Sequence, residues 1–399
     1  MLRFVPPAGA PLRMSQILKA VRKALPSNGH GEELSEVLAS RLGMTYVFAA
    51  CSGRAALWLI LRSLRQLKPE RDVVALPAYT CFSVAASVVR AGLKIHPVDI
   101  DPNTLDFDHS QLEALPGERL LCVIPSNLFG FVNDLPRIRY SAQAKGAFVL
   151  DDAAQALGAT RNGRFAGTLG DVGLYSLGRG KALASIEGGL IVTNSDEIAR
   201  SLQTEAKNLK TPPVSHGVWL VLEMLIYSIL VRPRLYWIPN AMPFLKLGIT
   251  EFNPAFATDE LHSVCQALLP PLLDGLPEIN EIRRANAEVL TEALTGSPDF
   301  AVPRLAPNTQ PTFVRLPVVA RDKFVRERTV SRLREAGFGA SAYYPSAICD
   351  IAALKPDMCV PEFHRHSAEL LAERLLTLPV NPLVRPQDLE RMVDILTSS

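Results

Sequence analysis

The chain contains 399 residues, of which 48% are hydrophobic and 21% are charged, as is typical of a globular protein large enough for two domains. Its 42 lysines and arginines nearly balance its 40 aspartates and glutamates, and no basic run stands out, so the charge pattern does not indicate a nucleic-acid partner. The six cysteines form neither a CxxC pair nor a cysteine–histidine cluster with metal-ligand spacing, which predicts reduced thiols, a cytoplasmic location and no metal site.

The first half of the chain alternates between helices and short apolar strands. Such alternation with short connections predicts an α/β protein with a mostly parallel sheet covered by helices. Ligands bind such sheets at the carboxyl ends of the strands. Strands are expected at 44–50, 72–77, 93–100, 120–127, 147–156, 171–176 and 188–194, and helices at 14–25, 31–42, 51–64, 80–92, 134–145 and 196–209.

The second half of the chain predicts a smaller α+β domain. A helix capped near Thr258 is followed by a long helix at about 277–295, which should lead into that domain. We therefore expect a large domain at 1–270, which includes an N-terminal helical segment (1–44) and an apolar insertion (210–255), and a small domain at 271–399. The small domain should contain strands at 310–319, 338–345 and 376–380 and helices at 322–337, 366–375 and 385–396.

The segment 216–245 is more apolar than the rest of the chain. Its apolar run is too short, and with Glu223 too interrupted, for a transmembrane span. A buried helix or a helix at a subunit interface is the first interpretation. A membrane-surface contact through 216–245 is the alternative, because Trp219 and Trp237 flank the run and Arg232 follows it.

Lys181 lies in a loop of small residues, GRGKALAS, after the strand DVGLYS. Glycines allow close approach of the backbone to a ligand, and a lysine held out of bulk water can act as an amine nucleophile toward a carbonyl. Taken alone, Lys181 could equally be a solvated surface charge. The loop therefore makes Schiff-base chemistry a hypothesis that other motifs must support.

Two other polar motifs fall at strand ends. Ser52 and Gly53 open a helix whose free N–H groups suit an anion, although a serine there is also an ordinary N-cap. Asp151 and Asp152 close an apolar strand and, as neighbours on a strand, should face opposite ways. One of them can point into a site while the other caps a helix or meets solvent.

Several motifs occur in one order: SGRAAL, PAYT, AGLKIHPVDIDPNTL, DDAAQALGAT, LGDVGLYSLGRGK, EGGLIVTN and the terminal AERLLTLPVNPLVRPQDLERMVDIL. From about residue 45 to the end, the chain resembles the DegT/StrS-type sugar aminotransferases. These are fold-type-I enzymes that use pyridoxal 5′-phosphate (PLP). The resemblance implies a large PLP-binding domain and a smaller C-terminal α+β domain.

The resemblance implies roles for the central residues. Lys181 matches the lysine that forms the Schiff base with PLP and then moves the proton as general base and acid. Asp152 matches the carboxylate that pairs with the pyridine nitrogen. Gln155 matches the residue that hydrogen-bonds the phenolic oxygen of the ring, and Ser176 matches a phosphate-binding hydroxyl.

The phosphate-binding turn departs from the family pattern. Ser52 and Gly53 match the turn, but Arg54 stands where a threonine is usual, so its charge either pairs with the phosphate or points away. An aromatic residue usually covers the cofactor ring at the position of Cys81. Here Phe82, one residue later, is the candidate for that stacking role.

Two more residues are implied as parts of the site. Asn253 best matches an asparagine that is donated across the dimer to the phosphate, although the arginine that usually follows is missing. Tyr344, in AYYP, lies where the small domain closes over the site and is given a substrate role, with a core position as the alternative.

The resemblance implies an aminotransferase that passes an amino group from glutamate to a nucleotide-linked keto-sugar in polysaccharide or secondary-metabolite biosynthesis. It also implies a homodimer with a shared active site. Dehydratases of the same family typically lack the lysine, so Lys181 argues against that branch. Two alternatives are a non-catalytic or regulatory paralogue, suggested by the altered phosphate turn, and a membrane-associated transferase acting on lipid-linked sugars, suggested by 216–245.

Overall fold

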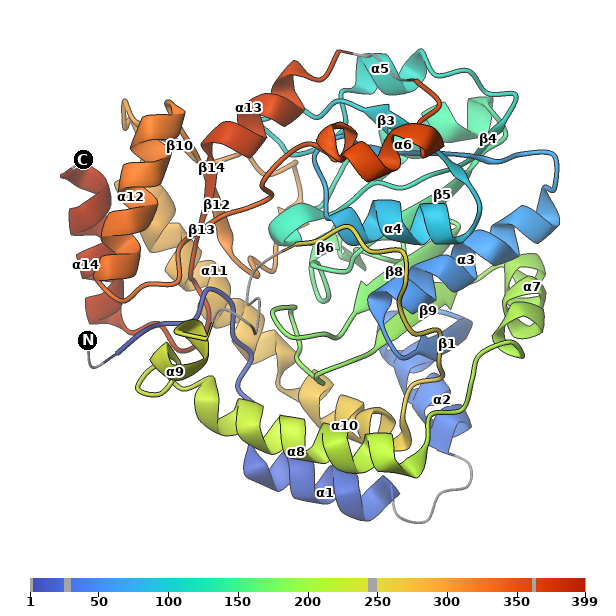
Figure 1. Cartoon of the computed structure of the whole chain (residues 1–399), viewed down its shortest axis with the longest axis horizontal. Coiled ribbons are helices and arrows are strands. Elements are labelled where there is room, and N and C mark those ends of the chain that lie inside the picture. The colour runs from blue at the N-terminus through green and yellow to red at the C-terminus, as the bar shows by residue number, and fades with distance from the viewer. Residues whose placement is uncertain (1–2, 25–29, 243–249, 361–363, 399) are drawn as a thin grey trace.

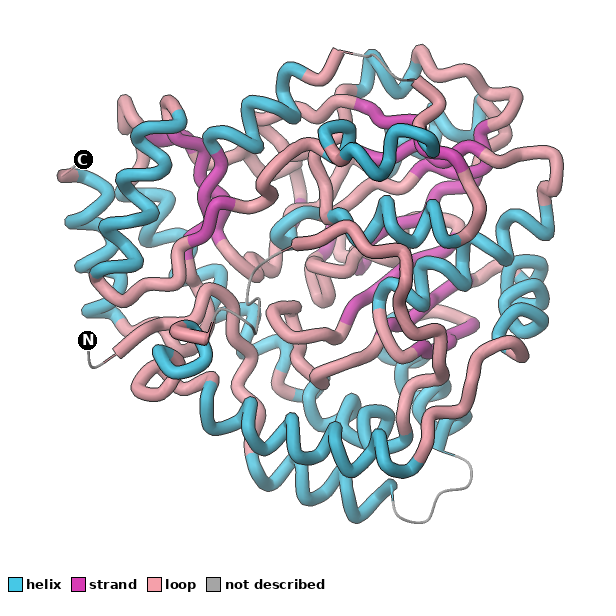
Figure 2. The backbone as a smooth tube through the Cα atoms, in the orientation of Figure 1, coloured by secondary structure: helices cyan, strands magenta, loops and turns pink. Residues whose placement is uncertain are grey.

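The computed structural model describes residues 3–24, 30–242, 250–360 and 364–398. A seven-stranded sheet has the order β1-β9-β8-β5-β4-β2-β3, and β9 runs against its neighbours while the other strands share one direction (Figures 1 and 2). The expected mostly parallel sheet is confirmed. The strands are β1 (Tyr46–Ala50), β2 (Val73–Pro77), β3 (Lys94–Val98), β4 (Leu120–Val123), β5 (Phe148–Asp152), β8 (Val172–Ser176) and β9 (Gly189–Thr193).

Helices cover both faces of this sheet, because its strands are apolar on both sides. On one face the side chains of Val74, Leu121 and Leu150 pack against α3 (Gly53–Leu67) and α4 (Phe82–Arg90), with α7 (Asp196–Ala206) outside α3. The other face, which includes Val149 and Val192, is covered by α1 (Met14–Ala24), α2 (His30–Leu42), α6 (Leu135–Ala144) and α10 (Ser263–Asp274). The short helix α5 (His109–Glu113) lies against α6.

A second sheet lies beside the first at the left of Figure 1 and has the order β10-β12-β14-β13, with every neighbouring pair antiparallel. Its strands are β10 (Phe300–Ala301), β12 (Leu316–Ala320), β13 (Ser341–Ala342) and β14 (Leu375–Leu378). The helices on this side are α11 (Leu276–Ala293), α12 (Lys323–Glu335), α13 (His366–Arg374) and α14 (Pro386–Thr397). The N-terminal segment also reaches this sheet, because the Val5 amide donates to the Gly337 carbonyl at 2.8 Å. The division at residue 270 stays a prediction.

Several expected element boundaries are wrong: for example, the strand expected at 338–345 is limited to β13, and the strand expected at 147–156 ends at Asp152. The strand expected at 310–319 is split: β11 (Thr309–Gln310) pairs with the hairpin β6 (Thr160–Arg161) and β7 (Arg164–Phe165), and β12 begins only at Leu316. Pro311 cannot donate to a ladder, and Phe313 has a positive φ of 41°, so the chain turns between the two strands.

The helix expected to be capped near Thr258 begins later. The Asp259 carbonyl accepts from the Cys51 amide at 2.9 Å, and residues 258–260 pair with Lys210, so the chain is extended there. Helix α10 begins at Ser263, and its N-cap is His262, whose Nδ1 accepts from the Val264 amide at 3.3 Å.

The insertion forms helix α8 (Val214–Leu230), followed by the short helix α9 (Trp237–Asn240). Helix α8 lies against α1 and α10 at the lower edge of Figure 1. Residues 243–245 of the predicted segment lie outside the described residues. In the part of the chain that the structure describes, no helix is both long enough and apolar enough to cross a bilayer.

Candidate active site

A cavity of about 160 Å³ opens at the carboxyl ends of β1, β2, β4, β5 and β8. Each strand contributes the residues that directly follow it, as the topology of a parallel sheet requires. Most of the predicted site residues meet here. The cavity is lined by Ser52, Gly53, Arg54, Asp152, Gln155, Ser176 and Lys181, together with Thr80, Cys81, Ser126, Asn127 and other neighbours.

Asp152 ends β5 and faces this cavity. Its Oδ1 accepts from the Ala154 amide at 3.0 Å, and its Oδ2 accepts from the Ser126 hydroxyl at 3.3 Å. The Thr80 hydroxyl donates to Ser126 Oγ at 3.1 Å, which orients the serine proton toward the carboxylate. Burial raises the pKa of Asp152, while the Ala154 amide and the charge of Lys181 act in the opposite direction.

Asp151 has a different role from the one expected. It neither caps a helix nor meets solvent: it is fully buried on the opposite face of β5. Its Oδ2 accepts from the amides of Gly167 and Leu169 at 2.6 and 3.2 Å, and its Oδ1 accepts from Asn127 Nδ2 at 2.7 Å. Asp151 therefore fixes the turn after β7, and only its neighbour Asp152 can act on a ligand in the cavity.

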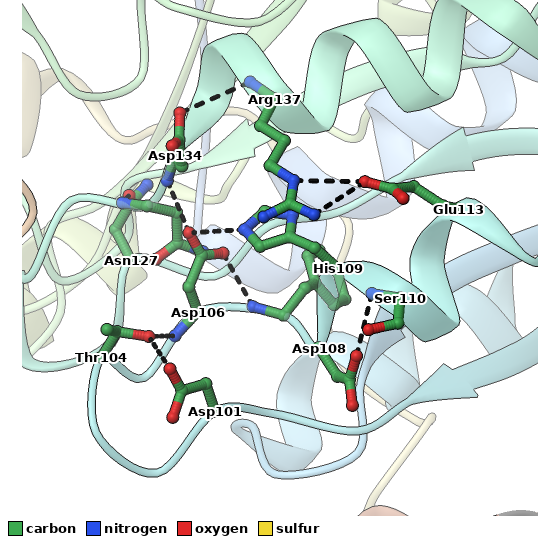
Figure 3. A network of polar contacts seen from close by, with 12 residues as sticks. Asp101, Thr104, Asp106, Asp108, His109, Ser110, Glu113, Asn127, Asp134 and Arg137 are labelled. Atoms are coloured by element: carbon green, nitrogen blue, oxygen red, sulfur yellow. Dashed lines mark hydrogen bonds and ion pairs between the residues drawn. The ribbon is translucent and has the colours of Figure 1, made fainter.

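Asn127 connects the Asp151 carboxylate and the backbone of Asp152 to an outer network of polar contacts, part of which Figure 3 shows. Its Nδ2 also donates to the Asp152 carbonyl at 2.9 Å, and its Oδ1 accepts from the Asn133 amide at 3.1 Å. Next to it, Asp106 accepts from the Asp134 amide at 2.6 Å. The start of α6 is thereby tied to the end of β5, which holds the carboxyl end of that strand in place.

The start of α3 and the end of β8 form an anion cup. Ser52 is the N-cap of α3, and its Oγ accepts from the Ala55 amide at 3.1 Å, so the capping interpretation is confirmed and its hydroxyl proton is still available to a ligand. A Cβ at Gly53 would lie 2.9 Å from Ser176 Oγ, so only glycine lets these segments approach so closely. First-turn N–H groups of a helix lack intrahelical partners and favour an anion.

Arg54 lines the cup with its side chain turned toward an aromatic ring. Its guanidinium carbon lies 5.2 Å from the centre of the Phe256 ring, and that of Arg90 lies 4.3 Å from the same ring. The Arg90 Nη1 also donates to the Pro254 carbonyl at 3.0 Å, which holds this segment on α4. The structure thus favours the interpretation in which the Arg54 charge points away from the phosphate position.

Lys181 lies in the lysine loop, which we define as residues 177–188 between β8 and β9. The ends of the loop are joined by a hydrogen bond from the Leu177 amide to the Gly188 carbonyl at 2.9 Å. The fully buried Arg283 of α11 donates to the Ala182 carbonyl at 3.1 Å. Among the described residues, Lys181 Nζ has no hydrogen-bond or ion-pair partner, and its charge lies near enough to Asp152 to lower the pKa of that carboxyl.

The structure does not bring Phe82 or Tyr344 to the cavity lining. Both are buried, and their rings stack at a centroid distance of 6.4 Å in an aromatic cluster behind the cavity. Gln155 connects the two regions, because its Nε2 donates to the Tyr344 hydroxyl at 2.9 Å and its Oε1 accepts from the Phe129 amide at 3.3 Å. Cys81, and not Phe82, lines the cavity, so the stacking role given to Phe82 lacks geometric support within this chain.

Asn253 is also placed elsewhere. Its side chain is exposed, and its Oδ1 accepts from the Ala255 amide at 2.8 Å. It does not line the cavity of its own chain, which is compatible with the predicted role in a second subunit and does not test it.

Sequence reasoning gave no site role to Thr80, Ser126, Asn127 or Arg283, although Thr80 lies in the motif PAYT. Ser126 and Asn127 end the predicted strand at 120–127, so their position at a strand end was a usable signal. Arg283 gave no local signal, because a charged residue in a helix is usually exposed.

Comparison with known proteins gives a consistent result. The sequence profile of the DegT/DnrJ/EryC1/StrS aminotransferase family matches residues 13–211 and 258–397. The chain is 27% identical over 395 residues to the UDP-N-acetyl-3-dehydro-alpha-D-glucosamine 3-aminotransferase of Acidithiobacillus ferrooxidans, covering 97% of this chain and 94% of that protein. It is 34% identical over 302 residues to the L-glutamine:2-deoxy-scyllo-inosose aminotransferase of Streptoalloteichus tenebrarius, covering 72% and 63%. Its fold is similar to that of Helicobacter pylori PseC, an aminotransferase of pseudoaminic acid biosynthesis, with a TM-score of 0.79, 16% identity and coverage of 99% and 98%.

Proposed function

Because the chain belongs to the DegT/DnrJ/EryC1/StrS aminotransferase family, we propose that it transfers an amino group from glutamate to a nucleotide-linked keto-sugar. Its reaction class and cofactor are those of the family: it is a PLP-dependent aminotransferase. The observation that carries the proposal is the meeting of Lys181 and Asp152 in one cavity, beside an anion cup.

The residues present fit PLP. The cup at Ser52, Gly53 and Ser176 offers hydroxyl and amide donors to a phosphate, and the close approach at Gly53 leaves no space there for a larger side chain. Asp152 supplies a buried carboxylate for the pyridine nitrogen, and Lys181 supplies the amine for the aldehyde carbon. When bound, PLP supplies the electron sink that lets a proton leave the α-carbon of the amino donor.

The residues of the chain then have distinct tasks. Lys181 Nζ would take the proton from the donor α-carbon and later return one, as general base and acid. Asp152, whose carboxyl oxygens accept from the Ala154 amide and the Ser126 hydroxyl, would hold a proton at the pyridine nitrogen. Gln155 lines the cavity, and its amide is held by Tyr344 and Phe129, so it would contribute a fixed polar group beside the bound cofactor.

The relatives named above support the proposed substrates. One is named for UDP-N-acetyl-3-dehydro-alpha-D-glucosamine and the other for L-glutamine and 2-deoxy-scyllo-inosose, which supports a keto-sugar acceptor and an amino-acid donor for this chain. Both relatives are named as aminotransferases, which supports catalysis rather than a purely regulatory role. A polysaccharide or secondary-metabolite pathway would use the product.

We also propose a cytoplasmic homodimer. The outer face of α8 exposes large apolar side chains on one stripe, which supports a subunit contact there, and a membrane-surface contact is the alternative. The exposed residues are Val214, Val218, Trp219, Leu222, Ile226 and Ile229.

The deciding experiment is the visible absorption spectrum of the purified protein with PLP, before and after addition of glutamate, for wild type and Lys181→Ala. We expect a band from lysine-bound cofactor that bleaches with glutamate in the wild type and is missing from the variant. Amino transfer to a panel of nucleotide keto-sugars then tests the acceptor. A wild-type protein that stays colourless with added PLP would contradict the proposal.

A further inference from the structure

Helix α8 is a part of this chain that the family profile does not match, because the matched ranges end at residue 211 and resume at 258. Its outer face is exposed, but its inner face is buried, with Leu220 at 1% and Met224 at 0% exposure. A Cβ at Gly217 would lie 2.3 Å from the His262 ring, so the helix is seated as closely as glycine permits. The helix is therefore firmly packed on the domain that holds the site.

Two side chains of α8 reach the lysine loop. Glu223 forms an ion pair with Arg179 at 2.8 Å, and His216 Nε2 lies 3.0 Å from Glu187 Oε2. Arg179 and Glu187 stand on either side of Lys181 in the sequence. The two contacts therefore restrain the loop at both flanks of the lysine, from an element that lies outside the family profile.

The other restraints on the loop come from matched parts of the chain. Arg283 of α11 binds the Ala182 carbonyl, and the Cys265 thiol of α10 lies 3.5 Å from the Ser185 carbonyl. Both contacts hold the middle of the loop through its backbone carbonyls. In the described residues, the side chains of Arg179 and Glu187 have no other ion-pair partners than Glu223 and His216.

We propose that α8 positions the lysine loop through these two pairs. Glu223 and His216 act as positioning residues, since they touch the loop and not the reacting atoms. A lysine amine must stay within reach of the donor α-carbon, and a displacement of about 1 Å can cost on the order of a hundredfold in rate. The catalytic role of Lys181 rests on the proposed function. The restraint on the loop does not, because it can be measured in the protein without cofactor.

The experiment is hydrogen–deuterium exchange of peptides covering residues 177–188 in the full-length apoprotein. Glu223→Gln and His216→Leu should each raise exchange in these peptides by roughly twofold to fivefold, the range expected for partly exposed pairs. His216→Gln keeps an N–H donor for Glu187 and should restore most of the protection. In the PLP-loaded enzyme, the rate of cofactor release should rise by a similar factor in the same order of variants.

Glu113→Gln is the matched control. It breaks a comparable pair, with Arg137 at 2.9 Å, which joins α5 to α6 and includes no residue of the lysine loop (Figure 3). We expect no change in the 177–188 peptides of this variant. Arg179→Met breaks the Arg179–Glu223 pair from the loop side and leaves the sequence of α8 unchanged. It therefore tests the proposal even if an α8 variant does not fold.

The proposal is overturned if exchange at 177–188 is unchanged in Arg179→Met and in the Glu223→Gln, His216→Leu double variant, or if Glu113→Gln produces the same increase. Failure of the proposed function would look different. A wild-type protein that binds no PLP would leave the comparison of exchange rates between apoproteins intact.

Discussion

Asp151 is a buried carboxylate whose ionisation opposes folding, so we expect it to make stability depend on pH. Burial raises its pKa from the ordinary 3.8 to about 6, against the effect of the hydrogen bonds from Asn127, Gly167 and Leu169. The native protein therefore keeps this proton at pH values where the unfolded chain has lost it. The stabilising contribution is complete below pH 3.8 and is lost as the pH rises to about 6. A difference of 2.2 pH units corresponds to roughly 3 kcal/mol.

Asp151→Asn removes the ionisation and keeps the shape. In the variant, one carboxyl oxygen is replaced by an NH2 group, which cannot accept a hydrogen bond. Either Asn127 or the two backbone amides of Gly167 and Leu169 then lose their acceptor, which costs about 1 to 3 kcal/mol of stability. Whatever the size of this constant penalty, the stability of the variant relative to wild type should rise by about 2 kcal/mol between pH 4.5 and pH 7.5. Urea unfolding across this pH range measures the free energy of unfolding of both proteins. In the difference between them, the contributions of the other titrating groups cancel.

A stability difference that does not change with pH would refute this reasoning, because it would mean that native Asp151 titrates in its ordinary range. The PLP absorption spectrum of Asp151→Asn serves as the control. It should match that of the wild type, since the Asp151 side chain does not line the cavity.

Three further substitutions test other parts of the molecule. Gly53→Ala places a Cβ 2.9 Å from Ser176 Oγ and should weaken PLP binding by about tenfold, measured by absorption titration; unchanged affinity would contradict the anion cup. Arg54→Thr should change the PLP dissociation constant by less than about threefold and lower stability by roughly 0.5 to 1 kcal/mol, because the guanidinium packs on Phe256; a large loss of affinity would show that it binds phosphate. Leu222→Glu, in the exposed stripe of α8, should raise the dimer dissociation constant at least tenfold in sedimentation equilibrium, and an unchanged dimer would exclude this face as the interface.

The sheet and most of the candidate site could be predicted because they depend on local signals. Alternating apolar strands and helices determine a parallel sheet, and such a sheet brings the residues after its strands to one edge. Ser52 and Lys181 follow strands, and Asp152 and Ser176 end strands, so their meeting required only the correct strand boundaries. The resemblance supplied their roles.

What the sequence does not report are contacts between distant segments. Phe82 lies one residue from the cavity lining, and its ring packs on Tyr344, which is far away in the sequence. The delayed start of α10 has the same origin, because the Asp259 carbonyl accepts from the amide of Cys51, a residue that is distant in the sequence and follows β1. No local pattern reports such a pairing, because its energy depends on both segments at once.

The two adjacent carboxylates show how far a local argument can go. Their opposite directions follow from the pleat of β5 alone, whatever surrounds the strand. Which of them faces the ligand depends on what covers each face, and here the turn at Gly167–Leu169 offers two amides to Asp151 while the other side is left open. The strand therefore determines that the two acids separate, and the neighbouring loop determines that Asp152 is the one available to the cofactor. Lys181 is positioned in a similar way. The sheet places its loop at the edge where the cavity opens, and α8, a segment outside the family profile, contacts the loop on both sides of the lysine.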